Sequence, residues 1–346
     1  MTGVLLVGNF LSHAGGSRGV CEDLAVRLAE AGWQVSTAST RSARIPRLAD
    51  MLATAWRRRH AYEVAHVDVF SGPAFIWAEA VAWLLRRLNK PYILTLRGGS
   101  LPSYARRYPR RVSALLRSAA VVTTPSGYLL EHMQPYCPAL RLLPNPIDLP
   151  LYPFRRREAP RPLLVWLRAF HTIYNPSLAV EVVARLAGEF PGVRLLMVGP
   201  DKGDGSLQKA QAHADRLGVR ERVTFAGGVP KREVGEWLSR GDIFINTTSV
   251  DNTPVSVIEA MACGLCVVST SVGGIPYLLE HEQDALLVPP GDAEAMAAAV
   301  RRILTDGELA ARLSQNARCK VEVFDWSVIL PEWEQLLLQA NIKNTG

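Results

Sequence analysis

The chain of 346 residues is 48% hydrophobic and 21% charged, which excludes a disordered protein and predicts a folded globular one. Its length exceeds what a single hydrophobic core usually spans, so we expect two domains. The net charge of +7 leaves nucleic-acid binding open, but no recognisable nucleic-acid module accompanies it. The longest apolar stretch, residues 74–85, is too short to span a bilayer, which excludes a transmembrane helix there.

Short apolar runs alternate with segments of helical periodicity, which predicts parallel sheets with helices on both faces. No basic residue precedes the first run, so we expect no signal peptide. Six strands are predicted in the first half, at residues 4–7, 34–38, 64–69, 92–96, 120–124 and 140–143. Six more are predicted in the second half, at residues 163–167, 194–198, 223–226, 243–246, 266–269 and 285–288.

The stretch of residues 145–162 interrupts this alternation and is rich in proline and arginine, so it is predicted to be a linker. We therefore expect an α/β protein with two doubly wound, Rossmann-like domains, at residues 1–155 and 156–326. A last helix, within residues 327–346, is expected to pack back on the first domain. The ligand is expected in a cleft where the carboxyl ends of the two sheets face each other.

Arginines cluster in the first half of the chain or at the end of that half. The clusters are residues 57–59, 86–87, 106–107, 110–111 and 155–157. Trp56, Trp77 and Trp83 lie close to several of these clusters. Arginine beside tryptophan on amphipathic helices is typical of contact with an anionic membrane surface. A solvated basic face is the alternative interpretation.

The five cysteines are odd in number and scattered, which argues against a disulfide framework. Cys263 and Cys266 form a single C-x-x-C pair that has no second pair or nearby histidine to complete a zinc site. The pair also closes a predicted helix, whereas a redox pair would open one. We expect packed, reduced thiols in a cytoplasmic protein.

Two glycines follow the first predicted strand. Gly15 and Gly16 precede a helix predicted at residues 20–31, where glycine lets backbone amides approach a phosphate. A tight turn would require the same residues for conformational reasons alone. His13 beside this loop and His66 within a strand could face a second substrate, and a structural histidine is the alternative for each.

Strand ends supply the next candidates. Arg97 and Gly98 follow the strand at residues 92–96, where a permanently charged arginine could bind a phosphate or an acidic acceptor, or be a structural arginine. Arg168 ends the first strand of the second domain, where side chains line the ligand crevice. Gly199 begins a loop after another strand of that domain.

The segment of residues 251–276 carries the most specific signal. Glu259 lies among apolar residues on most sides of a predicted helix, which predicts a buried carboxylate that needs a partner. Thr253 is expected to cap this helix and Pro254 to occupy its first position, with Asp251 just outside. A helix start with free amides beside two acids suits a polyhydroxylated, anionic ligand.

This segment resembles the signature of glycosyltransferase family 4, whose members are retaining enzymes with the GT-B fold. The family pattern is an acidic residue, seven others, then Glu-Ala-Met-Ala-x-Gly and a Val-Val strand. Asp251, residues 259–264 and residues 267–268 match it here, and Gly273 and Gly274 match the glycine pair that follows. The resemblance covers nearly the whole chain and is closest from residue 193 to residue 292.

The resemblance implies a nucleotide diphosphate sugar as the donor. Glu259 would hold the ribose hydroxyls, and Asp251 would orient the sugar. The rest of the implied donor site comprises Gly15, Gly16, Arg168, Gly199, Val229, Thr253, Val255 and Ser256. Among these, Arg168 and the glycine loop would stabilise the departing diphosphate, and Val229 would lie near the base. The acceptor would lie near Arg97, Gly98 and His13.

Among the departures from the family pattern, three concern residues near the implied reaction centre. Asp251 replaces the usual Glu, and Arg97 replaces a His, so a general base at that place is not expected. Asn175 occupies the position of a Lys that neutralises the diphosphate. Arg97, His171 and Lys202 are candidates to replace that charge. No Asp-x-Asp triplet is present, so we expect no metal and no cofactor, with cations and helix dipoles stabilising the leaving group instead.

The predicted function is a retaining, hexosyltransferase-type glycosyltransferase that uses a UDP- or GDP-sugar. A lipid-linked saccharide of surface polysaccharide biosynthesis is the expected acceptor, and the enzyme would be cytoplasmic or peripheral on the inner face of the membrane. A soluble acceptor remains an alternative. A GT-B protein that binds nucleotide sugars without transferring them, and a nucleotide-sugar epimerase of the same fold, are two further alternatives.

Overall fold

The computed structural model describes residues 2–11 and 19–342. The chain divides into two compact units, the first formed by residues 1–146 and 326–346 and the second by residues 147–325. The first boundary lies before the predicted one at residue 155, because the chain joins the second unit as soon as it leaves Pro146. There Ile147 forms a parallel bridge with Asp325, and its amide donates to the Phe324 carbonyl at 2.9 Å.

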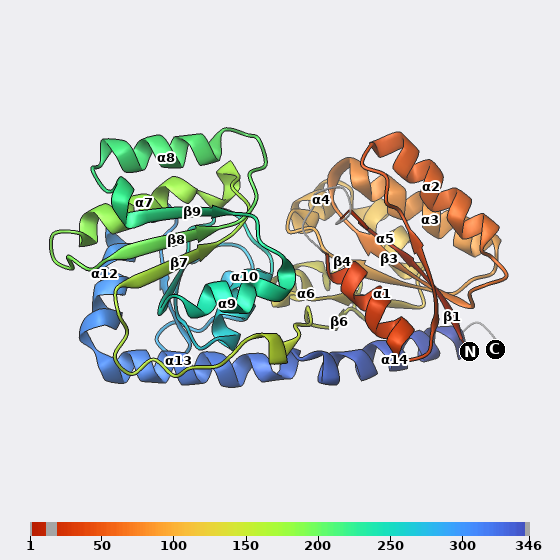
Figure 1. The fold of residues 1–346 in the computed structure, drawn as a ribbon. Coiled ribbons are helices and arrows are strands. Elements are labelled where there is room, and N and C mark those ends of the chain that lie inside the picture. The colour runs from red at the N-terminus through yellow and green to blue at the C-terminus, as the bar shows by residue number, and fades with distance from the viewer. Residues whose placement is uncertain (1, 12–18, 343–346) are drawn as a thin grey trace. The chain divides into compact units, whose positions relative to one another are not determined.

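The first unit is built on a parallel six-stranded sheet with the order β2-β1-β3-β4-β5-β6 (Figure 1). Its strands are β1 (Gly3–Val7), β2 (Gln34–Ala38), β3 (Val64–Val69), β4 (Tyr92–Leu96), β5 (Val121–Thr124) and β6 (Arg141–Leu142). Its helices are α1 (Val20–Glu30), α2 (Arg44–Arg57), α3 (Phe75–Arg87), α4 (Leu101–Arg107), α5 (Pro109–Arg117), α6 (Gly127–Met133) and α14 (Trp326–Ile342). All residues of β1 and β4 are buried, as expected of strands that helices cover on both faces.

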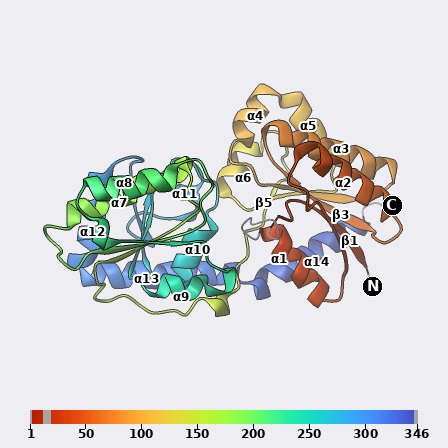
Figure 2. The ribbon, with the colours of Figure 1, turned by 45° about the horizontal axis from the view of Figure 1, so that its top comes forward.

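Helices lie on both faces of this sheet (Figure 2), and each face carries a separate hydrophobic core. Helices α2 to α6 cover one face, and α1 and α14 pack against each other on the opposite face. Trp333 of α14 contacts the buried His66 of β3 edge to face, with 5.0 Å between ring centroids. The indole of Trp33 donates to Glu334 at 2.9 Å. The last helix of the chain is therefore part of the first unit.

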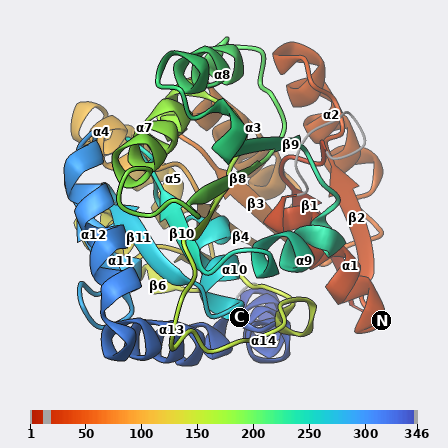
Figure 3. The ribbon, with the colours of Figure 1, turned by 60° about the vertical axis from the view of Figure 1, so that its left-hand side comes forward.

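The second unit has a parallel six-stranded sheet with the order β12-β11-β10-β7-β8-β9 (Figure 3). Its strands are β7 (Leu163–Leu167), β8 (Arg194–Val198), β9 (Val223–Gly227), β10 (Ile243–Asn246), β11 (Cys266–Thr270) and β12 (Ala285–Val288). Its helices are α7 (Pro176–Leu186), α8 (Ser206–Arg216), α9 (Val234–Ser239), α10 (Val255–Ala262), α11 (Ile275–Leu278), α12 (Ala293–Thr305) and α13 (Gly307–Val321).

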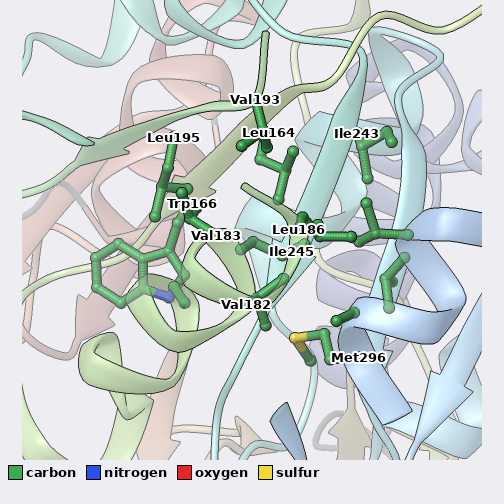
Figure 4. Close-up of a cluster of buried hydrophobic side chains, with 14 of the residues drawn as sticks. Leu164, Trp166, Val182, Val183, Leu186, Val193, Leu195, Ile243, Ile245 and Met296 are labelled. Carbon is green, nitrogen blue, oxygen red and sulfur yellow. The ribbon is translucent and has the colours of Figure 1, made fainter. Parts of the chain in front are cut away.

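This sheet also separates two cores. Figure 4 shows the core beneath α7 and α12, with Trp166 and Leu164 of β7 against Val183 and Leu186 of α7. The core on the opposite face is formed with α9, α10 and part of α13. The five cysteines are free, and all except Cys319 are buried. Burial raises the pKa of the Cys263 and Cys266 thiols to about 12, so both are packed thiols.

The twelve predicted strands are all present, and the predicted doubly wound α/β architecture is confirmed. The winding direction reverses once in each sheet, between β1 and β3 and between β7 and β10. At such a reversal the loops after the two strands separate, which opens a crevice at the carboxyl ends of the strands. The β7–β10 reversal therefore positions the candidate site of the second unit.

Residues 147–162, which make up most of the linker predicted at residues 145–162, belong to the second unit and are held by Asp242. We call this segment the strap. Asp242 is fully buried and forms ion pairs with Arg155, Arg157 and Arg161. Arg157 is itself buried and donates to the Gly241 carbonyl at 3.1 Å. All three arginines at residues 155–157 therefore pair with acids, Arg155 and Arg157 with Asp242 and Arg156 with Glu158.

Replacing Asp242 with alanine should lower the free energy of unfolding by about 3–5 kcal/mol, because Arg157 would remain buried without its counter-charge. Urea denaturation of the purified protein measures this change. Glu332→Ala, at an exposed acid of α14, is the matched control and should change stability by less than about 0.5 kcal/mol.

The same interaction predicts a pH dependence. Burial alone would raise the pKa of Asp242, but hydrogen bonds from Arg161 and Arg155 outweigh it and lower the pKa below its usual value. A carboxyl with a lowered folded-state pKa stabilises the protein above its unfolded pKa of about 4, and this contribution disappears as the pH falls through the folded value. The wild type should therefore lose more stability on acidification than Asp242→Ala. An equal loss in both proteins would contradict this account.

Candidate functional site

The β7–β10 reversal brings two predicted site residues together. Arg168 directly follows β7 and Asp251 lies in the loop after β10, and their side chains form an ion pair with 13% exposure each. The Arg168 guanidinium lies over the ring of Tyr174, 4.6 Å from its centroid. Burial lowers the pKa of Arg168 to about 10, so the guanidinium remains charged at neutral pH. Its Nε has no hydrogen-bond partner among the described residues.

The loop of Asp251 rests on the predicted glycine pair. The Asp251 carbonyl accepts from the Gly274 amide at 3.0 Å, and Asp251 Oδ1 accepts from the Asn252 amide at 2.8 Å. A Cβ at Gly273 would overlap the Asp251 carbonyl, and a Cβ at Gly274 would overlap that of Asn252. Gly273 also has a φ of +53°, which disfavours other residues. Glycine is therefore required here for close packing beneath the site.

Helix α10 begins one residue later than predicted. Pro254, and not Thr253, occupies the N-cap position, with a ψ of 111°, so the prediction of Pro254 at the first helical position was wrong. The extended Pro254 delays the helix, and its carbonyl accepts from Val257 and Ile258. The amides of Val255 and Ser256 lie in the first turn, where no intrahelical acceptor is available. The buried Ser256 hydroxyl also has no partner among the described residues.

Glu259 is buried one turn inside α10, with 3% of its surface exposed, as its apolar neighbours predict. Its Oε1 accepts a hydrogen bond from the Tyr152 hydroxyl at 2.7 Å and forms an ion pair with the Lys231 ammonium. Tyr152 belongs to the strap, and Lys231 lies in the turn that follows β9. Two groups from distant parts of the sequence thus stabilise this buried carboxylate.

The remaining predicted donor residues lie around this centre in different ways. Gly199 has a φ of +151°, and a Cβ there would overlap the Arg168 carbonyl, so glycine allows the loop after β8 to pass directly over Arg168. Val229 is half-buried and packs against the core beneath α10. Gly15, Gly16 and His13 lie outside the described residues.

The two candidates for a replacement cation in this unit do not contact the ion pair. His171 caps the turn of residues 172–174, where its Nδ1 accepts from the Ile173 amide at 3.2 Å, and its Nε2 lies 3.8 Å from Asp204. Lys202 is exposed, and its backbone amide donates to the Phe170 carbonyl at 3.2 Å. Asn175, at the position of the family lysine, has a left-handed φ of 45° before α7.

Arg97 belongs to a network inside the first unit. Its Nε donates to Asp68 at 2.8 Å and its Nη1 donates to Asn145 at 2.6 Å, which leaves Nη2 without a partner among the described residues. The backbone at Gly98 packs so closely on Ser71 that a Cβ would lie 2.9 Å from the Ser71 amide. Arg97, which directly follows β4, thus links Asp68 of β3 to Asn145, and its Nη2 remains available as a donor.

A small pocket lies at the carboxyl ends of β1 and β3 in the same unit. Asn9 and Asp68 form its polar wall, and Met51, Phe70 and Trp77 contribute apolar surface. His66, next to this wall, is fully buried and donates to or accepts from Thr95 at 2.8 Å. Burial lowers the pKa of His66 to about 4, so this histidine is neutral and structural.

Residues 154–320 match the family model described as Glycosyl transferases group 1. A D-inositol 3-phosphate glycosyltransferase of Segniliparus rotundus is 24% identical over 271 residues, which is 71% of this chain and 60% of that protein. The lipopolysaccharide core biosynthesis glycosyltransferase LpsE of Rhizobium meliloti is 31% identical over 196 residues, which is 56% of this chain and 52% of that protein. The chain thus spans less than two thirds of the length of either relative.

Solved structures resemble the chain over nearly its whole length. Sucrose-phosphate synthase from Thermosynechococcus elongatus has a TM-score of 0.75 at 21% identity, covering 98% of this chain and 99% of that one. Anabaena Alr3699/HepE in complex with UDP-glucose has a TM-score of 0.78 at 17% identity, covering 97% and 99%. The fold is therefore GT-B. The match of the second unit to the group 1 glycosyltransferase model agrees with the family 4 signature of the sequence.

Sequence reasoning missed Tyr152, Tyr174 and Lys231. Tyr152 and Lys231 lie 107 and 28 residues from Glu259 in the sequence, and no motif marks them. The one available signal was indirect, because a buried carboxylate requires partners that α10 itself does not contain.

Proposed function

We propose that the protein is a retaining glycosyltransferase that moves a sugar from a UDP- or GDP-linked donor to a hydroxyl acceptor. The observation that carries this proposal is the arrangement around the start of α10. Free amides and the buried Arg168 lie at one end of it, and the buried carboxylate of Glu259 lies one turn further along. Such a site matches a diphosphate joined to a ribose.

Each group has a role that follows from its charge and position. The amides of Val255 and Ser256 and the guanidinium of Arg168 bind the diphosphate, and the unpartnered Nε of Arg168 supplies a donor for it. Glu259 accepts hydrogen bonds from the ribose hydroxyls. Asp251, which is paired with Arg168, lies where the sugar attached to the diphosphate would be oriented. The HepE structure, which contains UDP-glucose, supports a donor of this class.

The proposed transfer needs no second catalytic carboxylate. The acceptor hydroxyl attacks the anomeric carbon on the face from which the diphosphate departs, so configuration is retained. The bond from that carbon to the phosphate oxygen breaks, and this oxygen takes the acceptor proton. Arg168 and the helix amides stabilise the negative charge that develops on the diphosphate. We propose that this stabilisation is independent of metal ions and cofactors.

Glu259→Gln should weaken binding of UDP or GDP by at least about tenfold, because a charged acceptor for the ribose hydroxyls becomes a neutral amide. Titration calorimetry measures the affinity of the wild type and the variant for both nucleotides. Glu308→Gln, at an exposed acid of α13, is the control and should bind like the wild type. Unchanged affinity in Glu259→Gln would remove Glu259 from the ribose site.

A transferase can be distinguished from a binding protein and from an epimerase by its products. Incubation with UDP-glucose, or with a GDP-hexose if calorimetry favours GDP, should give slow release of sugar and nucleotide when water replaces the acceptor. The released sugar should initially keep its anomeric configuration in NMR spectra. An intact donor would favour the non-catalytic alternative, and an isomerised donor would favour the epimerase.

We further propose a lipid-linked saccharide of surface polysaccharide biosynthesis as the acceptor. The supporting feature is a Trp-Arg surface, which we define as Ile45, Trp56 and residues 57–59 of the α2 region with Ile76, Trp83 and residues 86–87 of α3. Ile45, Trp56, Ile76 and Trp83 have 48–84% of their area exposed. Positions 45, 49 and 56 lie on one face of α2, and positions 76, 80, 83 and 87 on one face of α3.

The arginines of this surface have no acidic partner in the described part of the chain. Arg59 lies over the Trp56 ring at 4.7 Å, and Arg87 lies over the Trp83 ring at 5.1 Å. Helices α2 and α3 contact each other and follow strands of one parallel sheet, so their arginine-rich ends lie at the same edge. Exposed Trp beside unpaired Arg suits the headgroup region of an anionic membrane. No helix in residues 2–11 and 19–342 has the length and apolarity to cross a bilayer.

The wild type should co-sediment with liposomes that contain anionic phosphatidylglycerol, and the bound fraction should fall severalfold in 0.5 M salt, because the attraction is partly electrostatic. Trp56→Ala with Trp83→Ala should reduce binding further at low salt. Tyr277→Ala, at an exposed aromatic residue of the second unit, is the control. Equal sedimentation with neutral and anionic liposomes, or without any, would contradict the membrane proposal.

A further inference from the structure

The carboxylate of Glu259 is anchored asymmetrically. The Lys231 ammonium and the Tyr152 hydroxyl both contact Oε1, and no described residue donates to Oε2. Neither anchor belongs to α10, so the orientation of the carboxylate is set by separate segments of the second unit. Two contacts on one oxygen fix the direction in which the other oxygen is presented, because the carboxylate is planar.

The charges around the site balance only if Lys231 is counted. Asp251 is paired with Arg168, and Glu259 is paired with Lys231. Glu259 also acts electrostatically on Arg168, so the two pairs form one cluster. Without Lys231, two poorly exposed carboxylates would share a single cation, and the buried Glu259 would lack a counter-charge of its own.

The Lys231 side chain is more exposed than that of Glu259, and it can adjust its conformation when a ligand binds. The lysine side chain is 38% exposed and starts from the turn of residues 231–233, two positions after Val229. The Glu259 side chain is 4% exposed and fixed on a buried helix. A lysine stem can adjust while its ammonium stays on Oε1, so a bound diol could use Oε2 without displacing the lysine.

We propose that Lys231 is a positioning residue of the nucleotide site, which orients the Glu259 carboxylate so that Oε2 binds the ribose hydroxyls. This inference rests on the proposed function and assigns a role that the sequence motif does not contain. Because Lys231 acts through Glu259, it should contribute to the affinity for the ribose and not to the affinity for the phosphates. Loss of Lys231 should therefore affect recognition of the ribose 2′-hydroxyl selectively.

The test compares a nucleoside diphosphate with its 2′-deoxy form, UDP with dUDP or GDP with dGDP, by calorimetry on the full-length protein. The wild type should prefer the ribonucleotide by at least about tenfold, as expected for a hydrogen bond to a charged group. In Lys231→Met this preference should fall to near twofold, and in Lys231→Arg it should remain. Lys209→Met, at an exposed lysine of α8, is the matched control and should keep the wild-type preference.

Other outcomes would overturn the inference. A wild-type preference that persists in Lys231→Met would show that Lys231 does not orient Glu259. An equal weakening of both nucleotides would assign Lys231 to the phosphates, and tighter binding in Lys231→Met would make it a competitor of the ligand. If the wild type bound no nucleotide at all, the proposed function itself would fail, and this result is distinct from the others.

Discussion

The need to neutralise buried carboxylates organises the second unit. Asp242 and Glu259 are both nearly inaccessible, and each is stabilised by residues of the strap. Arg155, Arg157 and Arg161 bind Asp242 near the end of the strap, and Tyr152 donates to Glu259 near its beginning. A segment that begins as a connection between units thus links a structural carboxylate to the buried carboxylate of the candidate site. Close packing of Gly235 against the Leu151 carbonyl also holds the strap, directly before Tyr152.

The fold could be predicted from the sequence because parallel strands that are covered on both faces must be apolar along their whole length. The buried runs of β4 and β10 are examples, and their predicted boundaries match the structure. Prediction was less accurate where pairing rather than hydrophobicity decides the boundary. The edge strand β6 is only Arg141–Leu142, and the boundary between the units follows the bridge of Ile147 to Asp325. The start of α10 depends on the conformation of Pro254, which composition does not determine.

The candidate site could be predicted in part for a related reason. Arg168, Asp251 and Glu259 follow from strand ends and from one continuous motif, so local sequence identifies them. Their partners could not be predicted in the same way. Tyr174 lies over Arg168, and Lys231 binds Glu259, only because the sheet brings separate segments together. Likewise the pairing of Arg97 with Asp68 depends on β3 and β4 being neighbours, whereas the sequence shows only a charged residue at a strand end.

The ion pair between Arg168 and Asp251 limits how the site can bind a diphosphate. Arg168 has its charge engaged by Asp251, and the Asp251 loop is fixed on Gly273 and Gly274. A diphosphate would have to share this arginine, so Asp251, which we propose to orient the sugar, would also set how much positive charge the leaving group receives. The shorter aspartate strengthens this coupling, because it has one methylene less with which to turn away. Asp251 already balances the charge of Arg168. The backbone amides at the start of α10 have no such carboxylate bound to them among the described residues, and their positions are fixed by the backbone.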